Sequence, residues 1–355
     1  MPIPPSIPID PRRLGRSERQ MVFALASRGP LGWGALLDAQ DACIPEFVAA
    51  LERLRACGLV SVAGGEVRLV QPVAAPAPVA CACRACDSRG YVAASDLPAL
   101  GELQAALEGR PEPNFAFDQG AIPAEESLLR VAAMQDRGDL WGQSVLFVGD
   151  FDLTSVALAL SRQAARIVVL DIDPRVVDFV NQVGQRYGLP LSGRGFDVRQ
   201  ALPDDLRRSF DVFVCDPVET LPGIRLYLSR GAAALRGEAA AVWLGLTTVE
   251  ASRRKWFDIQ QVLAQMGFAL TDIRRRFSGY PDHDAPLEVA GLQWPVLSEL
   301  GAGGAHHRWY TASFLRAEAI RMPEPAVEGS VEMGEELYLD DEAWATPRAV
   351  VPALP

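Results

Sequence analysis

Short apolar runs alternate with amphipathic segments through the second half of the chain. The runs have the length of buried strands, and the segments between them place apolar residues at helical spacing. We expect strands at about 144–148, 166–170, 191–196, 212–215 and 239–244, helices at 123–137, 154–162 and 252–266 with another opened by Pro174, and a terminal antiparallel pair at 268–277 and 309–315. Such alternation is typical of a parallel sheet covered by helices. We therefore predict an α/β fold with a doubly wound, Rossmann-like sheet.

The first 70 residues carry a different pattern. Three amphipathic segments are followed by two short apolar runs that flank Gly64-Gly65, a pair suited to a tight turn. The first predicted helix begins at Ser17, and the other two cover 34–39 and 44–56. The predicted strands are 59–62 and 67–70. This order predicts a winged-helix-like module.

A winged helix can bind DNA through its third helix. Here that helix sets Glu46 and Glu52 against Arg53 and Arg55, so it has no net basic face. A role in dimerisation or as a lid is therefore favoured over DNA binding.

The overall charge further limits which classes of partner the protein is expected to bind. The chain has 355 residues and a formal net charge of −11, so nucleic acid would need a local basic face, whereas a polycationic small molecule would not. No secretory signal and no apolar run of membrane-spanning length is apparent. We expect a cytoplasmic protein with no membrane or nucleic-acid partner.

Six cysteines raise the question of a metal. Cys83 and Cys86 form a Cys-x-x-Cys knuckle that resembles half of a zinc ribbon, but no second such pair exists to complete four ligands. We therefore expect free thiols and no metal, with zinc at this knuckle as the minor alternative.

Acidic residues cluster where three of the predicted strands end. The clusters are Gly149-Asp150-Phe151-Asp152, Asp171-Ile172-Asp173 and Asp216-Pro217-Val218-Glu219. Because the carboxyl ends of the strands in such a sheet open onto the ligand crevice, these carboxylates should converge on one pocket. A pocket of this charge favours a cation.

One end of that pocket suits a nucleoside. An acidic residue after the second strand of this fold accepts hydrogen bonds from ribose hydroxyls, which points to Asp171, with Asp173 as the alternative. Asp173 precedes Pro174, so it also suits a helix cap. Asp197, after the third strand, is placed for the adenine amino group, and Gly149 allows the backbone to approach the ligand.

The loop after the predicted strand at 144–148 indicates which nucleoside the pocket accepts. Asp150 and Asp152 stand where a methionine carboxylate or a pyrophosphate would lie, and they would repel both. A donor that has lost its carboxylate and keeps an ammonium would fit. Decarboxylated S-adenosylmethionine is such a donor, and the group that it transfers is aminopropyl.

The cluster after the fourth strand suits the acceptor. An amine must lose a proton before it attacks the carbon next to a sulfonium, while its other ammonium groups need anions. We assign Asp152 and Asp216 as candidate proton acceptors, and Glu219 as the anchor of a distal ammonium.

These residues resemble the branched-chain polyamine synthase family of aminopropyltransferases. The likeness runs from about 119 to 277 and is carried by Arg137-Gly138-Asp139-Leu140, Asp150-Phe151-Asp152-Leu153-Thr154-Ser155, Leu170-Asp171-Ile172-Asp173, Gly245-Leu246-Thr247 with Lys255-Trp256, and Gly334-Glu335-Glu336-Leu337-Tyr338. It implies a Rossmann-like catalytic domain of the type that uses S-adenosylmethionine or its relatives, a winged-helix-like N-terminal domain, and release of methylthioadenosine. It also implies donor binding by Asp171 and Asp197, and acceptor chemistry by Asp152, Asp216 and Glu219.

The chain departs from the family pattern at two positions. Phe151 replaces the middle aspartate of a Gly-Asp-Asp-Asp motif, and Val218 replaces the second proline of an Asp-Pro-Pro-Glu motif. A ring in place of a carboxylate removes one ammonium contact and adds an apolar or cation–π surface. The acceptor is therefore expected to be a shorter, less charged or partly apolar amine, with Asp150 and Phe151 among its contacts.

Four segments follow from these patterns. We predict a winged-helix-like domain at 1–78, a cysteine knuckle and connecting region at 79–122, the catalytic domain at 123–322 and an acidic tail at 323–355. The tail has eight acidic residues against the single base Arg348, which is typical of a disordered segment. Its apolar residues, such as Leu337 and Trp344, instead favour docking as a flap over a cationic ligand.

The leading hypothesis is an aminopropyltransferase that acts on a polyamine or related amine, with no tightly bound cofactor and as a homodimer. An S-adenosylmethionine-dependent N-methyltransferase is the first alternative, because Asp-Pro-x-x also follows the fourth strand in amine methylators. A winged-helix regulator that senses a polyamine or nucleoside is the second.

Overall fold

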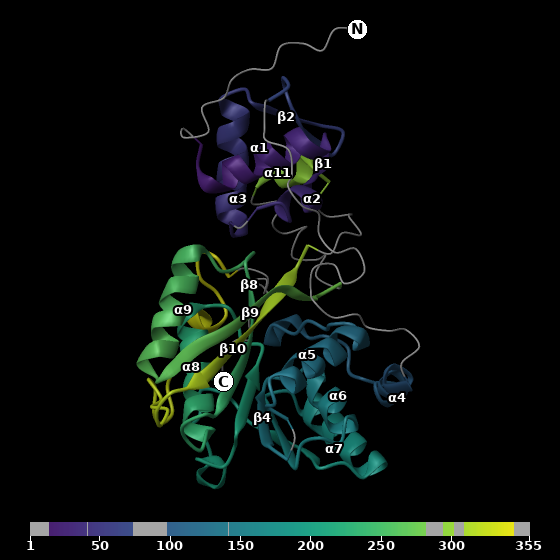
Figure 1. Ribbon diagram of the computed structural model, residues 1–355, viewed down its shortest axis with the longest axis vertical. Coiled ribbons are helices and arrows are strands. Elements are labelled where there is room, and N and C mark those ends of the chain that lie inside the picture. Colours follow the sequence, from purple (N-terminus) through teal and green to yellow (C-terminus); the bar gives the residue numbers. More distant parts are fainter. Residues whose placement is uncertain are drawn as a thin grey trace.

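The computed structural model describes residues 14–40, 42–73, 98–140, 142–281, 294–301 and 309–343. Figure 1 shows a small N-terminal lobe above a larger lobe of sheet and helices. Cys83 and Cys86 lie outside the described residues. Cys43, Cys57 and Cys215 are free thiols, in agreement with the expectation from sequence.

The small lobe contains the predicted helices and strands. Its elements are α1 (Arg16–Arg28), β1 (Leu31–Gly32), α2 (Trp33–Leu37), α3 (Ile44–Ala56), β2 (Val60–Ala63) and β3 (Glu66–Leu69). The strands form an antiparallel sheet in the order β1-β3-β2. Phe47, Leu51 and Leu54 are buried at helical spacing on α3, so one face of this helix forms the core of the lobe.

The small lobe shares its core with the rim of the large one. The same apolar cluster includes Val249, Tyr280 and Tyr310, together with residues of α11 (Pro295–Glu299). At the entry to α3, Ile44 N donates to Val249 O at 3.0 Å. The lobe is therefore packed directly beside the edge of the sheet where the pocket lies.

The large lobe is built on a seven-stranded sheet in the order β6-β5-β4-β7-β8-β10-β9. Its strands are β4 (Ser144–Val148), β5 (Arg166–Asp171), β6 (Leu191–Gly195), β7 (Val212–Cys215), β8 (Ala241–Thr247), β9 (Phe268–Gly279) and β10 (Thr311–Ala319). The first five strands in that order are parallel, and β10 is antiparallel to both of its neighbours. The predicted α/β class and the terminal antiparallel pair are confirmed. The sequence did not show that β10 lies between β8 and β9.

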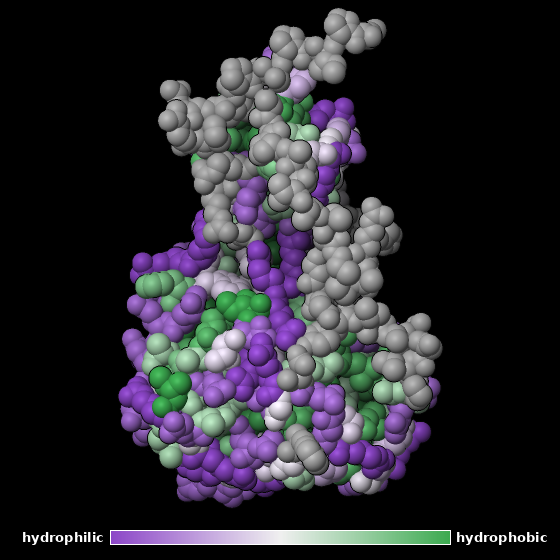
Figure 2. All heavy atoms as spheres, viewed as in Figure 1, coloured by the Kyte–Doolittle hydropathy of each residue, from purple (hydrophilic) through white to green (hydrophobic). Residues whose placement is uncertain are grey.

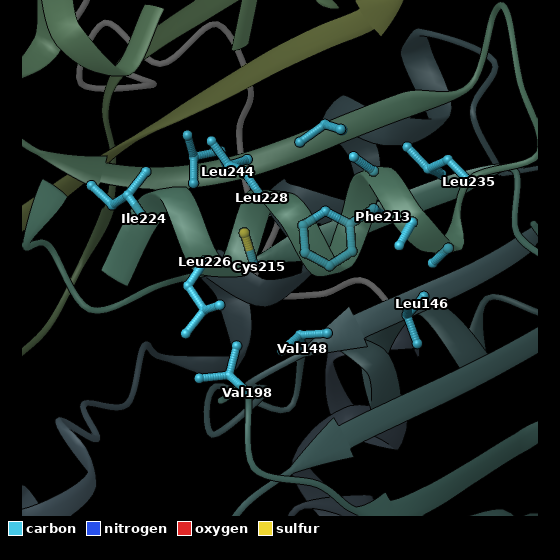
Figure 3. Packing of buried hydrophobic residues seen from close by; sticks show 14 of the residues in the cluster. Leu146, Val148, Val198, Phe213, Cys215, Ile224, Leu226, Leu228, Leu235 and Leu244 are labelled. Atoms are coloured by element: carbon cyan, nitrogen blue, oxygen red, sulfur yellow. The ribbon is translucent and has the colours of Figure 1, made fainter. Parts of the chain in front are cut away.

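Helices cover both faces of this sheet. The remaining elements are α4 (Pro98–Ala106), η2 (Phe115–Phe117), α5 (Ala124–Asp136), α6 (Thr154–Leu160), α7 (Pro174–Tyr187), η3 (Asp204–Leu206), α8 (Leu221–Ala234), α9 (Arg253–Gln265) and η5 (Glu335–Leu337). Alternate residues of β7 enter different clusters, because successive side chains of a strand point to opposite faces. Phe213 and Cys215 pack with α8 and α9, whereas Val212 and Val214 pack with α5, α6 and α7. Figure 3 shows the first of these clusters, with Phe213 and Cys215 beside Leu228 of α8.

The described part of the acidic tail is packed against the large lobe. Arg230 of α8, 2% exposed, donates to the tail carbonyl oxygens of Val327 and Gly329. Leu337 is buried in the core cluster of α8 and α9. Residues 323–343 are therefore docked on the large lobe, which is the second of the two expectations for the tail.

In the face that Figure 2 shows, hydrophobic residues form small patches among hydrophilic ones. Among the described residues, no helix combines the length and the apolar character needed to cross a bilayer.

Candidate active site

A pocket opens at the carboxyl ends of β4, β5, β7 and β8. Six carboxylates line it, together with aromatic and small residues from several loops. The acidic residues are Asp118, Asp152, Asp171, Asp197, Asp216 and Glu219. The structure thus brings the three clusters at the strand ends together, as expected for this edge of the sheet.

The loop after β4 begins and ends in a left-handed backbone conformation. Gly149 has φ +69° and Leu153 has φ +58°, and between them the chain makes a tight turn into α6. Phe151 and Asp152 line the pocket from this turn. Glycine is favoured at position 149 by this φ, which residues with a side chain rarely adopt.

Asp150 does not line this pocket. Its carboxylate accepts a hydrogen bond from Ser155 N at 3.2 Å, at the start of α6, and its own N–H donates to Asp171 Oδ2 at 3.1 Å. Burial raises the pKa of Asp150 well above its usual range. The geometry therefore gives Asp150 a role in shaping the loop, and it places the carboxylate outside the pocket that the sequence led us to expect it to line.

At the β5 end, Asp171 and Asp197 both line the pocket. Asp171 is 5% exposed and accepts hydrogen bonds from the N–H groups of Asp150 and Asp173. Burial raises its pKa. Against the effect of burial, hydrogen bonds from Arg199 lower the pKa of Asp197. Both aspartates line the pocket, and their assignment to the nucleoside stays a prediction.

Asp173 acts as a helix cap and lies outside the pocket. It accepts from Arg175 N at 2.9 Å, the first turn of α7, and from Gln119 Nε2 at 3.0 Å. The capping interpretation of this residue is confirmed. The hydrogen bond from Gln119 holds the loop at 117–120, which lines the pocket, against Asp173.

At the β7 end, one buried arginine joins two of the candidate catalytic carboxylates. Arg130 of α5, with a side chain 3% exposed, donates to Asp152 Oδ2 at 2.6 Å and to Asp216 Oδ2 at 2.8 Å. Its Nε donates to Ser278 Oγ at 2.8 Å, and Tyr280 OH donates to the same oxygen of Asp216. Such an arrangement fixes both carboxylates at defined positions.

One oxygen of Asp152 is left without a partner among the described residues. Its Oδ1 is buried and has no hydrogen-bond partner among the described residues. Burial raises the pKa of Asp152 to about 7, although Arg130 acts in the opposite direction. A carboxylate with a pKa near neutrality and an unused oxygen in a pocket is suited to accept a proton.

Asp216 lies against the backbone of β8. A Cβ on Gly245 would stand 2.0 Å from Asp216 Oδ1 and 2.5 Å from Cγ. Only glycine leaves room for the carboxylate there, which explains why the chain places Gly245 in the middle of a buried strand.

Glu219 is held by the end of β8. It is 5% exposed, and its carboxylate accepts from Thr247 N at 2.5 Å and from Thr247 Oγ1 at 2.6 Å. Burial and the charge of Glu250 raise the pKa of Glu219 well above its usual range. The Lys255 ammonium donates to the main-chain oxygens of both glutamates, at 2.9 and 3.0 Å.

Lys255 also binds the tail. Its Nζ lies 2.8 Å from Asp340 Oδ2 and 3.8 Å from Glu342 Oε2. Nearby, Thr220 Oγ1 donates to Leu337 O at 2.7 Å, and Tyr338 lines the pocket. The tail thus forms part of the wall of the site.

Sequence reasoning assigned no role to Arg130, Tyr280 or Asp118. Arg130 lies 22 and 86 positions from its two carboxylate partners, and Tyr280 lies 64 positions from Asp216. No local spacing connects them. The one available signal was a lone arginine among the apolar residues of an amphipathic helix, where a buried cation requires an anion.

Comparison with known proteins agrees with this geometry. The profile of the branched-chain polyamine synthase A C-terminal domain matches residues 99–345. The chain belongs to the branched-chain polyamine synthase family.

Relatives from two organisms show how far the family likeness extends. An N(4)-bis(aminopropyl)spermidine synthase of Thermus thermophilus is 38% identical over 298 residues, which are 82% of this chain and 85% of the relative. One from Thermococcus kodakarensis is 32% identical over 93% of this chain and 95% of its own length. The likeness therefore includes the small lobe.

Two solved structures of the family have the same fold. The branched-chain polyamine synthase of Thermus thermophilus, in complex with N4-aminopropylspermidine and 5'-methylthioadenosine, superposes with a TM-score of 0.79 at 34% identity, over 92% of each chain. Its C9 mutein, in complex with the same two molecules, gives a TM-score of 0.81 over the same shares.

Proposed function

We propose that this branched-chain polyamine synthase family member transfers an aminopropyl group from decarboxylated S-adenosylmethionine to an amine and releases methylthioadenosine. The observation that carries the proposal is the division of one pocket into two ends. Asp171 and Asp197 suit the nucleoside, and the pair Asp152 and Asp216, fixed by Arg130, suits an amine. The ligands of the related Thermus thermophilus enzyme, a branched amine and methylthioadenosine, support both assignments.

The reaction is a direct displacement. The lone pair of the acceptor nitrogen attacks the carbon bound to the sulfonium, a C–N bond forms, and the C–S electron pair returns to sulfur as a neutral thioether. The proton of the attacking nitrogen passes to a carboxylate, for which Asp152 is the candidate because its Oδ1 is unused and its pKa is about 7. Asp216 orients the amine, and Glu219 lies further along the pocket for a second nitrogen. No tightly bound cofactor takes part in this scheme.

The pocket favours this reaction over methyl transfer. Intact S-adenosylmethionine carries a carboxylate, which would enter a space lined by six acidic residues and would be repelled there. The decarboxylated donor brings only cations.

The small lobe has the element order of a winged helix, and we propose that it supports the catalytic lobe. The entry of its third helix is joined to Val249 O, and Arg55 on this helix pairs with Glu299 at 3.0 Å. Both contacts use the helix that would otherwise read DNA. We keep the expected domain limits, 1–78, 79–122, 123–322 and 323–355, the homodimer and the cytoplasmic location as proposals.

The acceptor is proposed to be less charged than the motif of the family would suggest. Phe151 lines the pocket next to Asp152, and the guanidinium of Arg110 lies 5.4 Å from its ring centroid. A ring backed by a cation offers an apolar surface where a further carboxylate would hold an ammonium. Val218 adds to this apolar wall.

Calorimetry with three ligands tests the function. Decarboxylated S-adenosylmethionine, intact S-adenosylmethionine and methylthioadenosine are titrated separately, and amines are then screened with the preferred donor by mass spectrometry. Preferential binding of the decarboxylated donor and a product heavier by one aminopropyl group are expected. Equal or tighter binding of the intact donor would favour the methyltransferase, and a gel shift with DNA in the absence of donor binding would favour the regulator.

A further inference from the structure

A row of four aromatic rings connects the small lobe to the amine end of the pocket. The ring of Trp33, on α2, has its centroid 5.7 Å from that of Trp309, and Trp309 lies 5.2 Å from Tyr310. Tyr310 in turn lies 5.6 Å from Tyr280. The last two contacts are edge-to-face, an arrangement that the quadrupoles of the rings favour. The two tyrosines line the pocket, so this aromatic row leads from the small lobe into the site.

The aromatic row is held rigidly. All four residues are buried in one apolar cluster, which also contains the core of the small lobe. Tyr280 directly follows β9, Tyr310 directly precedes β10, and Tyr280 N donates to Tyr310 O at 3.0 Å. Because a close-packed interior leaves little free space, a ring that loses its neighbour shifts and the next ring follows.

One end of the aromatic row holds Asp216. Tyr280 OH donates to Asp216 Oδ2 and accepts from Arg130 Nη2 at 3.0 Å. Hydrogen bonds weaken steeply when their length or angle departs from the optimum. The position of the Tyr280 ring therefore helps to determine where the Asp216 carboxylate lies.

Tyr310 reaches the second carboxylate of the amine end through one further residue on each side. Its OH donates to Glu250 Oε2, and Glu250 N donates to Thr247 Oγ1 at 3.1 Å. Thr247 Oγ1 itself donates to Glu219 Oε2 at 2.6 Å. The aromatic row is thus linked by hydrogen bonds to both carboxylates that we assign to the acceptor amine, apart from Asp152.

Two polar contacts fix the small lobe beside the aromatic row. Ile44 N donates to Val249 O at 3.0 Å, directly before Glu250. Arg276 of β9 donates to the main-chain oxygen of Asp38, which caps the end of α2. The helix that carries Trp33 is therefore held at a defined position relative to β9 and the rim of the pocket.

We propose that Trp33 is a positioning residue, through which the small lobe holds the amine end of the pocket in its reactive geometry. Trp33 does not line the pocket itself; it acts through Trp309 and the two tyrosines. This inference rests on the proposed function, and it gives the small lobe a specific part in that function.

Trp33→Met tests the inference, because methionine fills apolar space without supplying a ring. A shift of about 1 Å at a reacting group costs roughly 100-fold in rate, so kcat/KM for the amine should fall about 10- to 100-fold. The acceptor is spermidine, or the amine that the screen ranks above it. The Kd for methylthioadenosine should stay within about twofold of the wild type, since this ligand occupies the nucleoside end.

A conservative variant and a stability control accompany it. Trp33→Phe keeps a smaller ring and should lose about threefold in kcat/KM, and it carries the test if Trp33→Met does not fold. Leu54→Ala is the control, because Leu54 is buried in the same cluster but lies ten residues after Ile44, about 15 Å along α3 from the contact with Val249. It should lower the melting temperature and leave kcat/KM within about twofold of the wild type.

A double-mutant cycle separates positioning from a general effect on folding. Tyr280→Phe combined with Tyr310→Phe keeps both rings and removes both hydroxyl contacts. Calorimetry with the amine in the presence of methylthioadenosine needs no turnover. Trp33→Met should raise the Kd of the amine about tenfold in the wild type, and less than about threefold in the Tyr280→Phe/Tyr310→Phe background.

The outcomes distinguish this inference from its basis. Equal losses in both backgrounds, a similar loss of kcat/KM in Leu54→Ala, or equal weakening of methylthioadenosine and amine would overturn the role of Trp33 and leave the proposed function standing. A wild-type protein that transfers aminopropyl to no amine would overturn the proposed function, and this inference with it.

Discussion

Replacing Gly245 by alanine should disable the amine end of the site while leaving the nucleoside end intact. The new Cβ would stand 2.0 Å from Asp216 Oδ1, whereas real Cβ atoms essentially never approach a neighbour closer than 3.0 Å. The carboxylate must therefore move by at least about 1 Å. The hydrogen bonds that Asp216 accepts from Arg130, at 2.8 Å, and from Tyr280 would be lost or badly bent by such a shift.

The size of the effect follows from this displacement. A misplacement of about 1 Å at a reacting group costs roughly 100-fold in rate, so kcat/KM should fall by about that factor. Overpacking of this kind costs about 1–3 kcal/mol of folding stability, which the protein should tolerate. The Kd for methylthioadenosine should remain within about twofold of the wild type, because Asp171 and Asp197 lie at the other end of the pocket.

The assay is the initial rate of methylthioadenosine release with saturating donor and varied amine, with calorimetry for methylthioadenosine binding. Gly195→Ala is the matched control, because Gly195 also lies in a strand of the same sheet and a Cβ there meets nothing within 4 Å. A Gly245→Ala enzyme with a wild-type kcat/KM would refute the placement of Asp216 in the reacting centre. Equal losses of rate and of methylthioadenosine binding would instead indicate general disruption of the sheet.

Three further results are expected. Burial raises the pKa of Asp152 from 3.8 to about 7, so between these values the folded protein holds a proton that the unfolded chain releases. Thermal denaturation should therefore show the stability of the wild type falling relative to that of Asp152→Asn as pH rises from about 4 to 7. A relative rise over that window would contradict this assignment. Lys255→Met should free the tail from its ion pair with Asp340 and speed its limited proteolysis, whereas Arg254→Met, at an exposed position next to it, should not; equal cleavage of both would argue against the ion pair as the anchor. Phe151→Asp should increase kcat/KM for spermidine relative to less charged amines by about tenfold, and an unchanged ranking of amines would show that the ring does not select the acceptor.

The sequence was informative wherever a local pattern determines the structure. Apolar runs identified the strands, and parallel strands place their carboxyl ends at one edge, so the meeting of Asp171 with Asp216 was predictable without coordinates. The cap at Asp173 followed from the proline after it. The start of α5 was also predictable, because two glutamates occupy its first turn.

Direction within a tight turn was not predictable. Asp150 and Asp152 are two residues apart, yet only Asp152 faces the pocket, because Gly149 and Leu153 bracket them in left-handed conformations. Leucine rarely takes this conformation, and its burial to 1% exposure holds it there. Nothing local to the sequence signals such a turn.

Long-range pairing was not predictable either. Arg130 needs Asp152, Asp216 and Ser278, which are spread over more than half of the large lobe's sequence. Only the assembled sheet brings these residues within reach of one guanidinium. The loop with Asp118, which lines the pocket, was missed for the same reason, because it precedes β4 and its position depends on the hydrogen bond from Gln119 to Asp173.

The position of β10 between β8 and β9 sets the order in which the site can be completed during synthesis of the chain. Residues Thr311–Ala319 are made after both neighbours, so β9 has no strand partner until they emerge from the ribosome. Ser278 and Tyr280, at the end of β9, hold Arg130 only once that pairing exists. A nascent chain that ends before β10 would thus contain every predicted catalytic residue and still lack the contacts of Arg130 with Ser278 and Tyr280.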